Sequence, residues 1–101
     1  MNQTIMLVED EHLIRKTTKR YLTEKGYNVF EATNGEEGYK LFRESRTDLV
    51  ITDLRMPKMD GMEMMRLILN DSPDTPIIIF SGMGKVVDVI TPNYKAIARF
   101  Q

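Results

Sequence analysis

Ile5-Met6-Leu7-Val8 is a wholly apolar run, and two acids, Glu9 and Asp10, follow it at once. A strand that is covered on both faces has this kind of composition, which is typical of parallel sheets. Three later stretches are also predicted to be strands: Tyr27–Ala32, Leu49–Thr52 and Ile77–Phe80. Longer amphipathic stretches separate these runs, so the sequence predicts βαβ units and an α/β fold.

The first amphipathic stretch, Glu11 to Lys25, has helical spacing. The apolar positions expected on its inner face are Leu13, Ile14, Thr17, Tyr21 and Leu22. Gly26 stands where a left-handed C-terminal cap belongs. The sequence therefore predicts a helix that ends just before Gly26 and turns those side chains inward.

Two further helices are predicted from their capping residues. Asn34, followed three residues later by Glu37, resembles a capping box, and this helix is expected to stop near Ser45. Asp60 and Glu63 have the same spacing at the start of a third helix. The side chains expected on the inner side of the third helix are Met62, Met65, Ile68 and Leu69.

The residues after Phe80 predict a change of structure. Gly82 and Gly84 indicate a flexible exit from the last predicted strand. A short helix is expected from about Lys85, and Pro92 is expected to end it.

Composition limits the kind of protein. The 101 residues, 42% of them hydrophobic and 29% charged, fit one domain. With 14 Lys plus Arg against 15 Asp plus Glu, no basic excess favours a nucleic-acid partner. The absence of cysteine excludes disulfides and thiolate metal sites. The longest apolar run, Ile77–Phe80, is far shorter than a bilayer span, so no membrane contact and a cytoplasmic location are expected.

Three acids follow two of the predicted strands: Glu9 and Asp10 after the first, and Asp53 after the third. If those strands are neighbours, their carboxyl ends lie about 5 Å apart. Open parallel sheets bind ligands outside these ends. Three negative charges so close together repel one another, so a divalent cation is expected among them, and oxygen-only ligands favour Mg²⁺.

Each of these residues also has a simpler interpretation. Asp10 could cap the first helix, Glu9 could be a solvated residue at a strand end, and Asp53 could be a turn residue. Their coincidence at two strand ends favours the metal site. Ser81 is open between a turn residue and a hydroxyl aimed at a bound anion. His12, the only histidine, is expected at the surface, because one histidine cannot build a metal site or a triad alone.

Three segments together resemble the signature segments of response-regulator receiver domains. They read LVEDE at residues 7–11, TDLRMPKMDG at residues 52–61 and FSG at residues 80–82. The resemblance spans residues 4 to about 90. It implies a flavodoxin-like, doubly wound parallel sheet with strand order 2-1-3-4. The fifth strand of that fold is expected to be missing.

The same resemblance implies a role for each site residue. Asp53 matches the phosphoacceptor, which takes a phosphoryl group from a phosphohistidine of a sensor histidine kinase. Glu9 and Asp10 match the acidic pair that holds Mg²⁺, with Asp10 the more direct ligand, and the backbone carbonyl of Arg55 matches a further ligand. Ser81 matches the hydroxyl that contacts the phosphoryl group and shifts on activation. The expected function is a phosphorylation switch of two-component signalling and not an enzyme.

The resemblance fails near the end of the chain. Receiver domains continue past strand four with a helix, a fifth strand ending in Lys-Pro and a last helix. Here residues 86–92 read VVDVITP, and residues 93–100 match nothing in the family. We therefore predict an incomplete receiver domain over residues 1–91 and a tail outside the family over residues 92–101.

The missing lysine of strand five leaves other functions open, because that lysine would counter the phosphoryl charge. One alternative is a receiver fragment with impaired phosphorylation that acts only as a protein-interaction module. Another is an α/β phosphatase or nucleotide-binding enzyme. This last class is disfavoured, because the chain has no Gly-x-x-x-x-Gly-Lys loop and has Arg55 where a general acid would stand.

A missing fifth strand also has a consequence for assembly. The backbone groups of Ile77–Phe80 are then expected to form an unpaired sheet edge, and the sheet face beside the first helix is expected to be uncovered. An open apolar edge is a template for another chain, so a homo-oligomer through strand four is expected. The competing outcome is a tail that folds back within its own chain after Pro92.

Overall fold

The computed structural model describes residues 2–53, 59–80, 86–90 and 98–99. The chain begins with β1 (Thr4–Val8), α1 (His12–Glu24), β2 (Asn28–Ala32) and α2 (Gly35–Glu44). It continues with β3 (Leu49–Asp53), α3 (Gly61–Asp71) and β4 (Ile77–Phe80). The last two strands are β5 (Val86–Ile90) and β6 (Ala98–Arg99). The four predicted strands and three predicted helices are thus present, with ends that differ by a residue or two.

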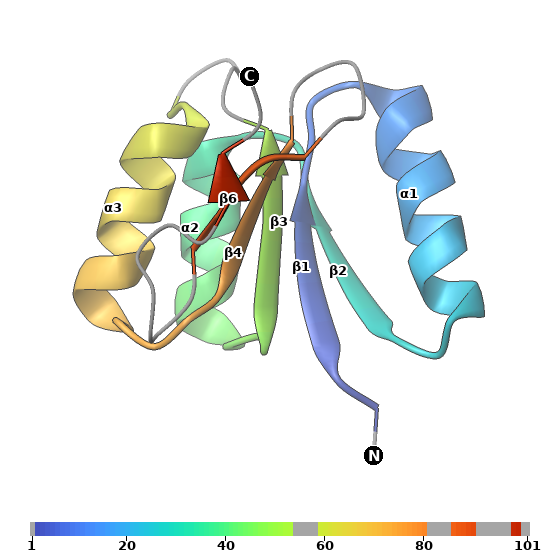
Figure 1. Ribbon diagram of the computed structural model, residues 1–101, viewed down its shortest axis with the longest axis horizontal. Helices are drawn as coiled ribbons and strands as arrows, with labels where there is room; N and C mark the ends of the chain where they lie inside the picture. Colours follow the sequence, from blue (N-terminus) through green and yellow to red (C-terminus); the bar gives the residue numbers. More distant parts are fainter. Residues whose placement is uncertain (1, 54–58, 81–85, 91–97, 100–101) are drawn as a thin grey trace.

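One twisted sheet carries the described strands in the order β2-β1-β3-β4-β5-β6. The pairs among β2, β1, β3 and β4 are parallel. α1 lies on one side of the sheet, and α2 and α3 lie on the other (Figure 1). This is the flavodoxin-like arrangement with order 2-1-3-4 that the resemblance implied, and it is confirmed.

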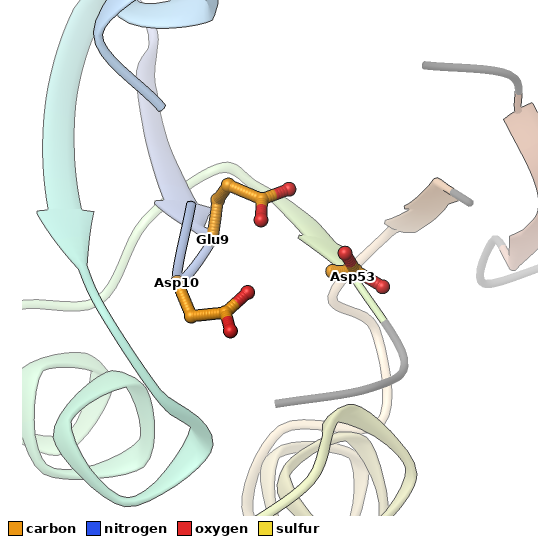
Figure 2. Close-up of side chains that lie close together, drawn as sticks. All are labelled: Glu9, Asp10 and Asp53. Atoms are coloured by element: carbon orange, nitrogen blue, oxygen red, sulfur yellow. The ribbon is translucent and has the colours of Figure 1, made fainter. Parts of the chain in front are cut away.

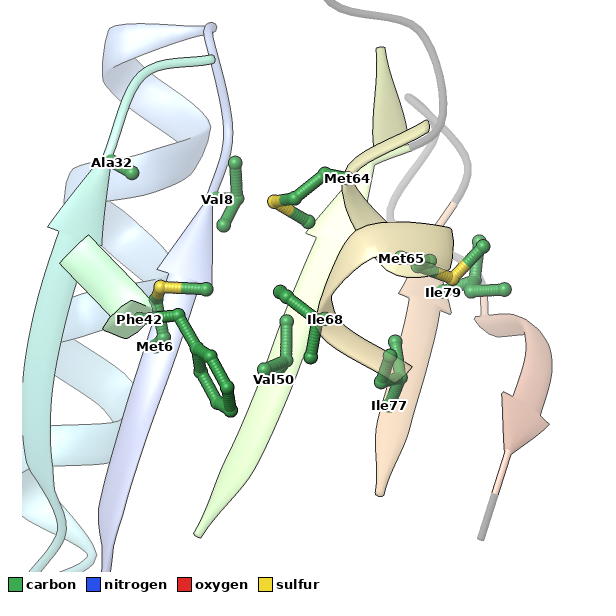
Figure 3. Packing of buried hydrophobic residues seen from close by; sticks show 10 residues of the cluster. All are labelled: Met6, Val8, Ala32, Phe42, Val50, Met64, Met65, Ile68, Ile77 and Ile79. Atoms are coloured by element: carbon green, nitrogen blue, oxygen red, sulfur yellow. The ribbon is translucent and has the colours of Figure 1, made fainter. Parts of the chain in front are cut away.

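The larger core fills the space between the sheet and the helices α2 and α3 (Figure 3). Met6, Val50, Met64 and Ile68 are completely buried there. Met62, predicted to face inward, is instead 59% exposed, and that prediction was wrong. Buried positions 61, 64, 65 and 68 follow the spacing of one helix face, and residue 62 lies off it.

The smaller core lies on the side of α1 and is centred on Ile5, Leu7 and Ile51, each at most 4% exposed. Three predicted core positions of α1 are wrong, because Leu13 is 71% exposed, Tyr21 is 59% exposed and Thr17 is also exposed. The partly buried residues Ile14, Thr18 and Leu22 form the i, i+4, i+8 row of the helix. The buried residue of α1 is an arginine, Arg15, which pairs with Glu31 of β2, so the helix is rotated by about one position from the orientation that hydrophobicity alone predicts.

The helix ends are capped by the predicted residues. The Asn34 side chain accepts from the Glu37 N–H at 2.8 Å, and the Asp60 side chain accepts from the Glu63 N–H at 2.9 Å. In a standard capping box the Glu37 side chain would accept from the N–H of Asn34. Here it accepts instead from the N–H of the preceding residue, Thr33. After α1, Gly26 has φ of 99°, which is the left-handed conformation expected of it.

The predicted helix from about Lys85 is wrong. Residues 86–90 form β5, which pairs antiparallel with β4, and four of its five residues are branched and apolar, a composition that favours strands. β6 then pairs antiparallel with β5. Gly82, Gly84 and Pro92 lie outside the described residues.

The premise of edge association is wrong for the same reason. β5 occupies the edge of β4, so Ile77–Phe80 is not an open edge. Ile5, Leu7 and Ile51 are buried, so the sheet face beside α1 is not uncovered at these positions. The strand pairs of β4, β5 and β6 match the competing expectation, in which the end of the chain folds back onto its own sheet.

Candidate functional site

The three acids meet at the carboxyl edge of the sheet. The register pairs Val8 of β1 with Thr52 of β3, so Glu9 and Asp53 follow at the same level of the two neighbouring strands. Glu9, Asp10 and Asp53 each offer a carboxylate oxygen, and these oxygens all lie within 4.8 Å of one another. Figure 2 shows the carboxylates of Glu9 and Asp10 reaching from one strand end toward the space beside Asp53.

Burial gives the cluster its electrostatic character. Glu9 is 5% exposed and Asp53 is 8% exposed, whereas Asp10 is open to solvent. Burial raises the pKa of Glu9 from its ordinary 4.5 to about 7, although a hydrogen bond from the Glu11 N–H opposes this. The negative charges of Asp53 and Asp10 contribute to this rise in the pKa. A bound cation would relieve this repulsion.

Hydrogen bonds hold both the main chain and the side chain of Glu9. Its N–H donates to the carbonyl of Ala32 at 3.0 Å, which is the last bond between β1 and β2. Its side chain accepts from the Glu11 N–H at 3.0 Å. The N-cap of α1 is Glu11, not Asp10, so the simpler interpretation of Asp10 as the cap is not supported.

The donor set fits a hard divalent cation. All three side chains offer carboxylate oxygens, which are the preferred ligands of Mg²⁺ and Ca²⁺. One open carboxylate beside two buried ones leaves a side from which an ion and its waters can enter. Two other predicted site residues, Arg55 and Ser81, lie outside the described residues. His12 is exposed, as predicted.

A small cavity of about 70 Å³ adjoins the acids on the side of α1. Its polar lining residues are Glu9, Asp53 and Thr18, and apolar side chains from β1, β3, β4 and α1 complete the wall. The space is enough for about two water molecules. This cavity is too small to hold a nucleotide.

Sequence reasoning missed Arg15. Its guanidinium is nearly buried, and its Nη1 donates to the carbonyl oxygen of Glu9 at 3.0 Å. A basic residue in the first turns of an amphipathic helix is normally solvated, so periodicity gave no signal for this contact. The clue available was the lone acid in β2, Glu31, at a position that faces α1.

Comparison with known proteins identifies the family of this chain. A model of the response regulator receiver domain matches residues 5–97. The chain belongs to this family. Response-regulator receiver domains are parts of two-component signalling systems, so that assignment by resemblance is confirmed. No helix among the described residues of this receiver domain is long and apolar enough to cross a membrane.

Curated relatives of this receiver domain are longer proteins. The uncharacterized transcriptional regulatory protein YcbL of Bacillus subtilis is 39% identical over 83 residues, which cover 82% of this chain and 36% of that protein. The transcriptional regulatory protein GlrR of Escherichia coli is 34% identical over 96 residues, covering 95% of this chain and 22% of that protein. The chain thus spans about a third or less of the length of these relatives.

Solved receiver structures agree with the fold. The response regulator TrrA of Thermotoga maritima, crystallised in complex with Mg²⁺–BeF, is 39% identical, with a TM-score of 0.76 over 78% of this chain and 69% of that chain. A CheY-like receiver domain protein of Methanospirillum hungatei is 27% identical, with a TM-score of 0.78 over 81% of this chain and 66% of that chain.

Proposed function

We propose that this receiver domain accepts a phosphoryl group on Asp53 from a phosphohistidine of a sensor histidine kinase. Mg²⁺ is held by Glu9, Asp10 and Asp53, with the backbone carbonyl of Arg55 as a further ligand. The observation that carries the proposal is the convergence of three carboxylates within 4.8 Å, two of them nearly buried, at the carboxyl edge of a parallel sheet. Such edges are where open α/β sheets bind ligands.

The reaction is a transfer between two nucleophiles. A carboxylate oxygen of Asp53 attacks phosphorus, the bond from phosphorus to the histidine nitrogen breaks, and an acyl phosphate forms on Asp53. The metal, when bound, neutralises charge on the transferring group. Most of the barrier is lowered by positioning, which the main-chain bonds of Glu9 and the rigid end of β3 supply. Ser81 is proposed to bond a phosphoryl oxygen.

Local contacts support Asp53 as the acceptor. The buried hydroxyl of Thr52 donates to the carbonyl oxygen of Asp53 at 2.8 Å, and this bond fixes the main chain at the end of β3. Asp53 also pairs with Phe80 in the β3–β4 register, so its main chain is held inside the sheet and not in a loop. Its side chain is therefore presented from a rigid position, as a nucleophile requires.

The relatives support the metal and the partner. TrrA, 39% identical, is described in complex with Mg²⁺ and BeF, and the donor set here consists of the oxygen ligands that Mg²⁺ prefers. We propose a stoichiometric phosphoacceptor in the cytoplasm, not an enzyme acting on a separate substrate and not a nucleic-acid-binding domain. The receiver unit is proposed to span residues 1–91, with residues 92–101 as a tail.

Intact-mass measurement after incubation with Mg²⁺ and a small acyl-phosphate donor tests the proposal. One phosphoryl adduct is expected on the wild-type chain, and hydroxylamine should remove it, as it cleaves acyl phosphates. Asp53→Asn keeps the shape but removes the nucleophile, so the adduct should vanish. Asp74→Asn, which changes an exposed acid in the turn before β4, is the matched control and should keep it.

Two results would separate the alternatives. An undiminished adduct in Asp53→Asn contradicts the assignment of Asp53. A wild-type chain that binds Mg²⁺ but never takes up the phosphoryl group indicates instead the interaction module with impaired phosphorylation.

A further inference from the structure

Arg15 joins three parts of the molecule that meet beside the acids. Its Nη1 donates to the carbonyl oxygen of Glu9 at 3.0 Å, at the end of β1. Its Nε lies 3.2 Å from Oε1 of Glu31 on β2, and its Nη2 lies 3.2 Å from Nδ1 of His12 at the start of α1. Arg15 is 9% exposed, so the guanidinium forms these contacts in a largely dry environment.

The contact with Glu9 acts on the peptide that links the two neighbouring acids. The Glu9 carbonyl belongs to the peptide group that enters Asp10, so its orientation sets the direction in which Asp10 leaves the strand. The Glu9 N–H is already fixed by Ala32. Arg15 therefore restrains the carbonyl end of the Glu9–Asp10 peptide directly, in addition to the bond from the Glu11 N–H to the Glu9 side chain.

Glu31 in turn holds Arg15. Its carboxylate also receives Lys16 at 3.1 Å and Lys19 at 2.9 Å. These lysines are 49% and 40% exposed and pair with Glu31, whereas Arg15 also reaches the main chain of Glu9. The planar guanidinium, with donors pointing in several directions, suits this bridging task, and a lysine does not.

We propose that Arg15 is a positioning residue for the cation site, setting the Glu9–Asp10 peptide so that the acids suit Mg²⁺. This inference rests on the proposed function, because it assumes that Mg²⁺ binds there. It assigns no contact between Arg15 and the ion. Outer residues that orient metal ligands in this way commonly change metal affinity by about 10-fold or more.

Charge and geometry predict opposite results for Arg15. Removing a positive charge beside a cation site tightens cation binding if charge alone matters. Losing the restraint on the Glu9–Asp10 peptide weakens it. Arg15→Lys keeps the charge and removes the fork of donors, whereas Arg15→Gln removes both, so the two variants separate the effects.

The two alkaline-earth ions supply a second discriminator. Mg²⁺ demands near-ideal octahedral geometry, whereas Ca²⁺ accepts six to eight ligands in flexible arrangements. Misplaced acids should therefore weaken Mg²⁺ binding more than Ca²⁺ binding. A general loosening of the fold lowers both affinities alike, so the ratio of the two dissociation constants reports on positioning.

The experiment is a calorimetric titration of the full chain with Mg²⁺ and with Ca²⁺, after circular dichroism has shown that each variant is folded. Arg15→Lys should weaken Mg²⁺ binding about 10-fold and Ca²⁺ binding by clearly less. Arg15→Gln should also weaken Mg²⁺ binding despite the lost positive charge. Lys16→Gln is the matched control, which removes a charge from the same group and should leave the Mg²⁺ affinity unchanged or slightly tighter.

Wild-type Mg²⁺ affinity in Arg15→Lys, tighter binding in Arg15→Gln, or equal losses for both ions would each overturn the role of Arg15. A wild-type chain without Mg²⁺ affinity overturns the proposed metal site and this inference together, so the two failures are distinguishable. If neither Arg15 variant folds, Glu31→Gln, compared with Lys19→Gln, takes their place. A Mg²⁺-to-Ca²⁺ affinity ratio that falls only in Glu31→Gln supports the proposal, and an unchanged ratio overturns it.

Discussion

The backbone N–H of Gly35, the first residue of α2, donates to the carbonyl oxygen of Met59 at 2.9 Å. A Cβ at position 35 would overlap that same carbonyl oxygen. The close approach anchors the chain just ahead of α3 against the start of α2. It therefore fixes the position of Met59 beside the start of α2.

Gly35→Ala should destabilise the protein by about 1–3 kcal/mol, because two backbone segments must separate to admit the methyl group. Urea unfolding monitored by circular dichroism measures this. Gly38→Ala is the comparator, since an added Cβ there meets mainly the sulfur of Met64, which can move, and alanine favours helices. An equal or greater loss in Gly38→Ala would contradict the expectation.

Mg²⁺ should raise the melting temperature in proportion to the logarithm of its concentration once the site is near saturation, because it binds the folded state. Asp10→Ala should lose this response. Without Mg²⁺ the same variant should be as stable as the wild type or more stable, since one repelling charge is gone. Differential scanning calorimetry with Asp74→Ala as control decides, and a full Mg²⁺ response in Asp10→Ala rules that residue out as a ligand.

Metal-free stability should fall as pH rises from about 4.5 to 7 on account of Glu9. The pKa of Glu9 is raised to about 7 by burial, and then by Asp53 and Asp10, although a hydrogen bond from the Glu11 N–H lowers it in part. The folded state therefore keeps a proton that the unfolded state releases, and this favours folding at low pH only. The loss should be about 1–3 kcal/mol. Glu9→Gln should flatten the profile in denaturant unfolding at each pH, and an unchanged slope in that variant contradicts the assignment.

Glu31 should change the pH dependence of stability in the opposite direction from Glu9, and in a lower pH range. Burial alone would raise its pKa, but hydrogen bonds from Lys19 and Lys16 lower the pKa to about 2. Its stabilising effect is then present above pH 4.5 and is lost as pH falls toward 2. Because the lysines are well exposed, the effect should be about 1 kcal/mol or less. Comparing Glu31→Gln with wild type across that range, at low and high salt, measures it.

The strands could be predicted because short runs of branched apolar residues, such as Ile5–Val8 and Ile77–Phe80, are typical of buried strands. The acids could be predicted to converge because Glu9 and Asp53 follow such runs directly. The orientation of α1 could not be predicted, since its buried residue is a charged one, Arg15, whose partner Glu31 lies on a different element. The prediction from hydrophobic spacing alone placed Leu13 and Tyr21 on the inner face of the helix, where the structure does not have them.

The region after β4 was mispredicted for a different reason. Residues 86–90 read VVDVI, a run too short to distinguish a helix from a strand by its period. The branched side chains favoured a strand, and the prediction of a short helix gave this preference too little weight. The antiparallel register, which pairs Ile77 with Ile90 and Ile78 with Val89, depends on contacts with β4 that the hydrophobic pattern of residues 86–90 alone does not contain.

The antiparallel pair of β4 with β5 is expected to form faster than the parallel strand pairs of the sheet. Five residues separate Phe80 from Val86, and hairpins with such short connections close in about 1–10 μs. The parallel pairs of β1 with β2 and β3 join residues 24 and 44 positions apart, such as Thr4 with Asn28 and Ile5 with Leu49, so their loop-closure cost slows them. The end of the chain can thus pair before the edge that carries Glu9, Asp10 and Asp53 is assembled, and the acidic site belongs to the slow-forming half of the molecule.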